Sequence, residues 1–178
     1  MVPHMKKLLI SLCSLVALAL TSQLQAEPLA VGAEAPKVSS VDHTGKAVKL
    51  EDVYKKGPTL IFFYPKAHTG GCTKEVCGMR DSFADLNKLG LQVLGVSMDK
   101  EEDQKSFVEK QNLNFPLLAD TKGDVVKAFG VPEMKPGFPS RQSFLVKDGK
   151  IVWRDLAVKP DAHAENVKKA LEEALKAK

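Results

Sequence analysis

One segment constrains the fold more than any other: a continuous apolar run that ends at a proline and precedes a loop and an amphipathic stretch. Residues 58–64 read Pro-Thr-Leu-Ile-Phe-Phe-Tyr, and Pro65 follows. Such a run, rich in aromatic and β-branched residues, is typical of a central strand that is covered on both faces. From about Cys72 to Leu89, apolar side chains recur every three or four residues, which predicts a helix with one buried face.

The rest of the chain alternates predicted strands with predicted helices. Further strands are expected at 91–97 and 115–118, and helices at 99–111, 125–129 and 162–175. Hairpins are expected around the Asp-Gly turn at 148–149 and around the His-Thr-Gly turn at 43–45. This order predicts an α/β fold, a thioredoxin-like sandwich with a mixed central sheet flanked by helices.

The first 26 residues have the layout of a secretory signal peptide. Lys6 and Lys7 precede a short apolar stretch over 8–20, and Ala26 is a small residue at the expected cleavage point. This stretch is shorter than the about 20 apolar residues that an ordinary spanning helix needs. A retained membrane anchor is the alternative interpretation. We therefore predict a signal peptide over 1–26 and a mature domain over 27–178. The expected location is periplasmic or secreted, without stable membrane association.

The charge balance excludes some classes of partner. The formal net charge is +4, and the first 26 residues contribute two lysines and no acidic residue, which leaves +2 for the remainder. Such a balance does not favour nucleic acid or an anionic membrane as a partner. No apolar stripe indicates an interface, so a monomer is expected.

Two cysteines remain in the predicted mature chain, and Cys72 stands where the predicted helix begins. Helix N-terminal amides carry partial positive charge and lack internal partners, so they stabilise a thiolate there. A thiolate is the species that attacks an O–O bond. Thr69, three residues earlier, is expected to face the sulfur, donate to the thiolate and accept from a peroxide. Pro65 has no amide proton and is expected to shield the site from water.

Cys77 is the remaining mature cysteine, and its spacing from Cys72 argues against a permanent structural disulfide. Five residues of α-helix advance about 7.5 Å and rotate about 140°, which separates the Cα atoms by roughly 8.7 Å. A disulfide needs Cα atoms within about 7 Å, so the helix start must unwind for the bond to form. The spacing therefore favours a transient disulfide. A metal site is disfavoured because two cysteines on opposite helix faces lack the usual four ligands.

The segment Pro65-x-x-x-Thr69-x-x-Cys72 resembles the active-site signature of the peroxiredoxin family. The surrounding FYPKAHTGGCTKEVCGMRD is similar to the peroxiredoxin Q, or bacterioferritin comigratory protein, branch, and the resemblance extends from about Ala35 to the C-terminus. It implies that Cys77 is the second, resolving cysteine. It also implies that Arg141, in Pro-Ser-Arg-Gln-Ser-Phe, points at the catalytic sulfur.

The resemblance implies a thiol-dependent peroxidase. The Cys72 thiolate would reduce hydrogen peroxide or an organic hydroperoxide, and the resulting sulfenic acid would condense with Cys77. An external thioredoxin-like dithiol protein would reduce the disulfide, and no metal or other cofactor would be needed.

One departure from the family pattern lies beside the reactive cysteine. The family usually has proline after the threonine, whereas this chain has Gly70 and Gly71, which make the loop more flexible. Two alternatives stay open. A thiol–disulfide oxidoreductase fits the fold and compartment but normally carries Cys-x-x-Cys. A non-enzymatic protein with inert cysteines is the other.

Overall fold

The computed structural model describes residues 27–177, so the predicted signal peptide lies outside the described residues. Five strands form a central sheet in the order β5-β4-β3-β8-β9. Their bounds are β3 Thr59–Phe63, β4 Gln92–Ser97, β5 Leu117–Ala119, β8 Gln142–Lys147 and β9 Lys150–Asp155. Strands β3, β4 and β5 run parallel, while β8 and β9 are antiparallel to their neighbours. The predicted mixed sheet is confirmed.

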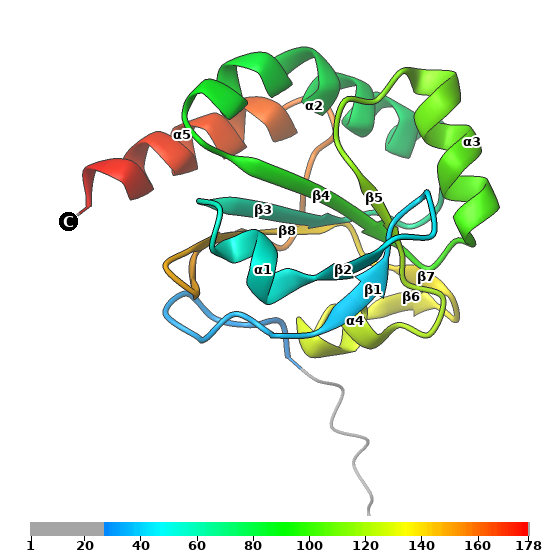
Figure 1. The fold of residues 1–178 in the computed structure, drawn as a ribbon, viewed down its shortest axis with the longest axis horizontal. Coiled ribbons are helices and arrows are strands. Elements are labelled where there is room, and N and C mark those ends of the chain that lie inside the picture. Colours follow the sequence, from blue (N-terminus) through cyan, green and yellow to red (C-terminus); the bar gives the residue numbers. More distant parts are fainter. Residues whose placement is uncertain (1–26, 178) are drawn as a thin grey trace, which may run out of the picture.

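Helices cover both faces of this sheet (Figure 1). The upper layer in that view contains α2, Gly70–Lys88, α3, Glu101–Gln111, and α5, His163–Lys176. The lower layer contains α1, Leu50–Tyr54, α4, Asp124–Ala128, and the hairpin of β1, Ser39–Val41, with β2, Ala47–Lys49.

The central strand β3 supplies side chains to two separate cores, as its apolar run predicted. Leu60 and Phe62 belong to the cluster under α2, α3 and α5, whereas Ile61 and Phe63 belong to the cluster that contains α1 and α4 residues. All five residues of β3 are buried. This double burial fixes the strand, and with it the starting point of the loop that follows.

Helix α2 begins at Gly70, two residues earlier than the sequence predicted. Thr69 is the N-cap residue, with φ −86° and ψ 151°, so the chain is extended until that point. The periodicity of apolar side chains marks only the buried face of a helix, and two glycines carry no such signal. The consequence is that Cys72 lies within the first helical turn rather than at its first residue.

Some short elements were not anticipated. They are α1 and a small hairpin of β6, Glu133–Lys135, with β7, Phe138–Pro139. Elements of two to five residues are too short to show a period of 3.6 or 2. The hairpin lies just before Arg141, so it belongs to the segment that delivers that side chain.

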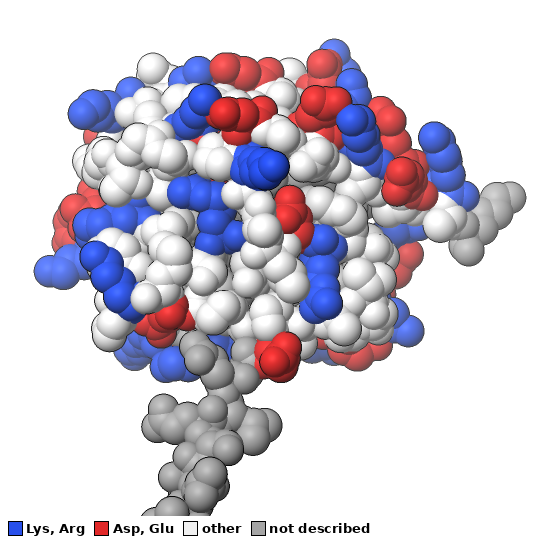
Figure 2. Space-filling view, turned by 180° about the vertical axis from the view of Figure 1, so that it is seen from behind, with Lys and Arg blue, Asp and Glu red and all other residues white. Residues whose placement is uncertain are grey.

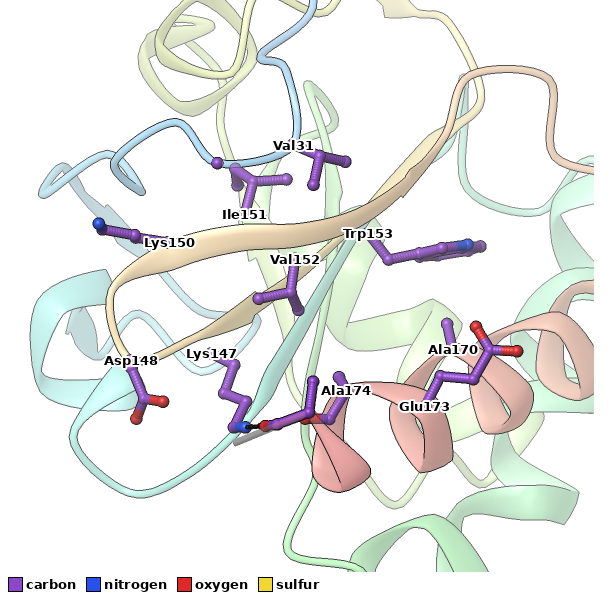
Figure 3. A pocket seen from close by; sticks show the side chains of 12 residues that line it. Val31, Lys147, Asp148, Lys150, Ile151, Val152, Trp153, Ala170, Glu173 and Ala174 are labelled. Carbon is purple, nitrogen blue, oxygen red and sulfur yellow. Dashed lines mark hydrogen bonds between the residues drawn. The ribbon is translucent and has the colours of Figure 1, made fainter.

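The surface is mixed in charge and carries an apolar hollow. Figure 2 shows Lys and Arg interspersed with Asp and Glu over the face opposite to that of Figure 1. This hollow has a volume of about 550 Å³, lies between β9 and the end of α5, and is lined in part by Val152, Trp153 and Ala174. Figure 3 shows these side chains around it. Its lining contains no residue of the cysteine loop. Over residues 27–177, no helix combines the length and apolarity needed to cross a bilayer.

Candidate active site

The Cys72 sulfur lies buried at the start of α2 and faces a guanidinium. The side chain of Cys72 is 1% exposed. Arg141, which immediately precedes β8, donates from Nη2 to Cys72 Sγ at 3.2 Å. Gly71 lies beside this guanidinium, since a Cβ atom built on it would lie in van der Waals contact with Arg141 Nη2 at 3.4 Å. The first-turn amides of α2 and the guanidinium both place positive charge near the sulfur.

Glu75 holds the other side of the same guanidinium. Its carboxylate is fully buried and forms an ion pair with Arg141 Nη1 through Oε2. Burial alone would lower the pKa of Arg141, but the negative charge of Glu75 and the Cys72 sulfur outweigh it and raise the pKa. The guanidinium therefore stays charged between a carboxylate and the sulfur.

The contacts continue from Glu75 to helix α5. Glu75 Oε1 lies 3.1 Å from His163 Nδ1, and His163 Nε2 lies 2.8 Å from Ser143 Oγ. The contact between Oε1 and Nδ1 falls short of a well-formed hydrogen bond, and neither atom has another partner within residues 27–177. His163 is completely buried, with its ring edge-on to Phe62.

Sequence reasoning did not identify Glu75 or His163 as site residues. One signal was available for Glu75: it lies three residues after Cys72 and four before Met79, on the buried face of the predicted helix. A charged residue on a buried helical face needs a partner. No comparable signal exists for His163, because its contact with Glu75 joins helices that are far apart in the sequence.

The loop ahead of Cys72 is fixed by Asp99, which follows β4. Asp99 accepts from the Ala67 amide at 2.8 Å and from Lys66 Nζ at 3.0 Å. Ser97 Oγ donates to the same carboxylate at 2.7 Å. These contacts tie the residues after Pro65, which is half-buried, to the neighbouring strand.

Thr69 lies at the N-cap of α2 and is exposed. Its hydroxyl donates to the Lys66 carbonyl oxygen at 3.0 Å, so its single proton is directed into the loop and not toward the sulfur. The expected donation to Cys72 is therefore not made in this arrangement. The lone pairs of the hydroxyl remain available to accept a hydrogen bond.

Cys77 lies apart from Cys72, on the side of α2 that meets the end of α3. Both cysteines are free thiols, and Cys77 is half-buried. Cys77 Sγ donates to Gln111 Oε1 at 3.5 Å, and Arg80 Nη1 donates to the Gln111 carbonyl oxygen at 2.7 Å. The pKa of Arg80 is raised, first by its hydrogen bond to Asp81 and further by the nearby Cys77 sulfur. A permanent positive charge therefore lies beside the second cysteine.

The described part of the chain holds no group of three or more His, Cys, Asp or Glu side chains arranged to bind a metal ion. A buried cysteine at a helix N-terminus, paired with an arginine on a thioredoxin-like sheet, defines a class of thiol-based redox proteins. Residues 31–154 match the AhpC/TSA family. The chain belongs to this family, the peroxiredoxins, and is a thiol-dependent peroxidase.

Individual relatives narrow the similarity to one branch. The chain is 44% identical over 131 residues to peroxiredoxin Bcp of Escherichia coli, covering 70% of this chain and 83% of that protein. The structure of PrxQ from Xylella fastidiosa superposes with a TM-score of 0.77 at 26% identity, covering 83% of this chain and 98% of that one.

A third similar protein is the bacterioferritin comigratory protein of Xanthomonas campestris. Its structure gives a TM-score of 0.75 at 28% identity and covers 82% of this chain and 99% of that one. That protein is described in terms of its alkyl peroxide reduction activity. The resemblance stated from the sequence is thus confirmed at the level of family and branch.

Proposed function

We propose that Cys72 is the peroxide-reducing cysteine of this enzyme. The observation that carries the proposal is the 3.2 Å contact between Arg141 Nη2 and the buried Cys72 sulfur in the first turn of α2. The thiolate attacks the terminal oxygen of the hydroperoxide, and the O–O bond breaks. Cys72 becomes a sulfenic acid, and the departing oxygen takes a proton to leave as water or alcohol.

Arg141 stabilises both the starting thiolate and the negative charge that develops on the departing oxygen. Its planar fork already binds Glu75 with one nitrogen and the sulfur with the other. Thr69 accepts a hydrogen bond from the peroxide through the lone pairs that its contact with Lys66 leaves free. Pro65 limits the access of water beside the loop.

Cys77 resolves the sulfenic acid. Its thiol condenses with Cys72, forming an intramolecular disulfide and releasing water. The start of α2 must unwind first, because ideal helix geometry keeps the two Cα atoms roughly 8.7 Å apart. A thioredoxin-like dithiol protein then reduces the disulfide and is itself oxidised.

Hydrogen peroxide and organic hydroperoxides are the proposed substrates. The alkyl peroxide activity ascribed to the similar Xanthomonas campestris protein supports the organic class. The basic and apolar pattern of residues 1–26 supports export to the periplasm or secretion, where a dithiol reductant of that compartment would act. A monomer is the proposed state in solution.

The test of the two-cysteine mechanism is rapid quenching of the reduced protein after mixing with peroxide, followed by mass spectrometry. Wild type is expected to pass to a Cys72–Cys77 disulfide. Cys77→Ser is expected to accumulate the Cys72 sulfenic acid, which excess peroxide then oxidises to sulfinic acid. Cys72→Ser is expected to stay reduced. A wild-type protein that forms no Cys72–Cys77 disulfide after oxidation, or a Cys72→Ser protein that oxidises at the wild-type rate, would overturn the mechanism.

A further inference from the structure

The contacts of the cysteine–arginine pair continue into a buried polar chain that passes through the first residue of α5 and ends on β8. The chain runs from Cys72 through Arg141, Glu75 and His163 to Ser143. Glu75 and His163 are fully buried, and Ser143 is buried on the central sheet. The chain joins α2, the segment before β8, β8 itself and the first residue of α5.

We propose that His163 is a positioning residue for the peroxide-reducing cysteine: it fixes Glu75, and Glu75 in turn aims Arg141 at Cys72. The inference rests on the proposed function of Cys72. His163 touches no reacting atom, so its action is indirect.

The chemistry of the two facing atoms assigns the form of the imidazole. Glu75 Oε1 only accepts hydrogen bonds when ionised, and His163 Nδ1 lies 3.1 Å away. An unprotonated Nδ1 would set two acceptors against each other in a buried site, so Nδ1 carries the hydrogen. In the neutral tautomer that carries its hydrogen on Nδ1, Ser143 Oγ donates to His163 Nε2 at 2.8 Å, which orients the ring.

Without this contact, Glu75 Oε1 would be a buried carboxylate oxygen with no polar neighbour. A buried charge in that condition turns toward another partner or draws in water. Either movement shifts the second oxygen, which holds Arg141 Nη1, and with it the fork that reaches the sulfur. The rate of Cys72 oxidation depends on the position of the Arg141 guanidinium, because the guanidinium stabilises the transition state only if it lies beside the oxygen on which negative charge develops.

The same contact restrains the part of α2 that must unwind. Glu75 lies between the two cysteines, so unwinding the segment from Cys72 to Cys77 pulls its carboxylate away from His163 and Arg141. Loss of the His163 contact therefore has opposite effects on the two steps. Oxidation of Cys72 becomes slower, while condensation with Cys77 becomes faster.

Three variants and one control test this role by stopped mixing with hydrogen peroxide and quantification of sulfenic acid and disulfide by mass spectrometry. His163→Leu removes both polar contacts. His163→Asn keeps an N–H at the position of Nδ1, and Ser143→Ala removes only the partner of Nε2. Val167→Ala creates a cavity one turn further along α5, in a fully buried position outside the chain of contacts, and controls for lost packing.

His163→Leu is expected to oxidise about tenfold more slowly than wild type and to form the disulfide severalfold faster. His163→Asn is expected to recover most of the lost oxidation rate, and Ser143→Ala to fall between the two. Val167→Ala is expected to melt at a lower temperature with both rates near those of wild type.

Three results would overturn the role of His163 and leave the proposed function of Cys72 intact. The first is a rate of Cys72 oxidation in His163→Leu equal to that of wild type. The second is a fall of both the oxidation rate and the disulfide rate of His163→Leu in proportion to its folded fraction. If His163→Leu does not fold, the third is an oxidation rate in His163→Asn and Ser143→Ala equal to that of Val167→Ala. Failure of the proposed function is distinguishable, since wild type itself would then react no faster than a free thiol.

Discussion

At the scale of single residues, the site is an alternation of charges around one sulfur. The Arg141 guanidinium lies between the Cys72 sulfur and the Glu75 carboxylate, and all three groups are wholly or mostly buried. A guanidinium suits this place because its fork supplies two separate donors, whereas an ammonium is a point charge. The arrangement argues that geometry, as well as charge, supports the reaction.

Replacing the guanidinium by an ammonium tests that argument. In Arg141→Lys, one nitrogen cannot occupy the two positions that Nη1 and Nη2 hold toward Glu75 and Cys72, so the rate of Cys72 oxidation is expected to fall about 100-fold. Competition with a peroxidase of known rate measures the second-order constant. Arg154→Lys is the matched control, because within residues 27–177 the Arg154 side chain donates its hydrogen bonds to the carbonyls of Pro28 and Leu29, away from the cysteines. Equal rates in Arg141→Lys and the control would contradict the account.

A second arginine is expected to act on the second step. Arg80 lies one helical turn after Cys77, close enough for its guanidinium to interact electrostatically with the sulfur. Its positive charge favours the attack of the Cys77 sulfur, as the negatively charged nucleophile, on the sulfenic acid. In Arg80→Met, disulfide formation is expected to slow about threefold to tenfold while Cys72 oxidation stays unchanged. Time courses of both products separate the two steps. A parallel fall of both rates would instead indicate a general loss of structure.

At the scale of elements, the start of α2 carries the most information. Gly70 is the first helical residue, Thr69 before it is extended, and a Cβ on Gly70 would meet no atom within 4 Å. Proline favours this first position, and the residue before a proline favours the extended conformation that Thr69 already has. The glycine is therefore tolerated by the fold rather than required by it.

Gly70→Pro is accordingly expected to stabilise the protein. The gain is about 0.5–1 kcal/mol in the free energy of unfolding, because the unfolded chain loses conformational freedom at that residue. Denaturant unfolding of both proteins measures the difference. Gly57→Pro is the opposing control, since φ there is +148° and proline cannot adopt it. A destabilised Gly70→Pro protein would show that the loop needs its glycine.

Most elements of the fold were predictable from the sequence, whereas α1, the β6–β7 hairpin and the long-range side-chain contacts were not. The double burial of β3 and the helical period of α2 were read from residues 58–89, and the Asp-Gly turn of the β8–β9 hairpin was placed correctly. The position of Arg141 opposite Cys72 was predicted only from the resemblance to the peroxiredoxin family. The Glu75–His163 contact could not be predicted, because no local pattern links residues on α2 and α5.

At the scale of the whole molecule, acid stability depends in part on Asp42 in the β1–β2 turn. Burial tends to raise the pKa of Asp42, but hydrogen bonds from the Thr44 hydroxyl, the Thr44 amide and the Lys46 amide outweigh it and lower the pKa below 3.8. The folded pKa is thus lower than the unfolded one. This contribution to stability is present at neutral pH and is lost as the pH falls through the folded pKa.

Asp42→Asn is expected to lower the free energy of unfolding by about 1–2 kcal/mol at neutral pH, because the charged acceptor is lost. The difference from wild type should begin to shrink as the pH drops below 3.8 and should disappear as the pH falls through the lower pKa of the folded state, where the folded carboxyl is also protonated. Thermal or denaturant unfolding across that range measures it. A difference that stays constant with pH would show that the charge of Asp42 contributes nothing.

The most direct test of the central claim is the second-order rate of peroxide consumption by reduced wild type and by Cys72→Ser. Wild type is expected to react far faster than a free thiol, Cys72→Ser is not, and Cys77→Ser is expected to keep the fast first turnover. Fast oxidation that persists in Cys72→Ser, or a wild-type rate equal to that of a free thiol, would contradict the assignment of Cys72 as the peroxide-reducing residue.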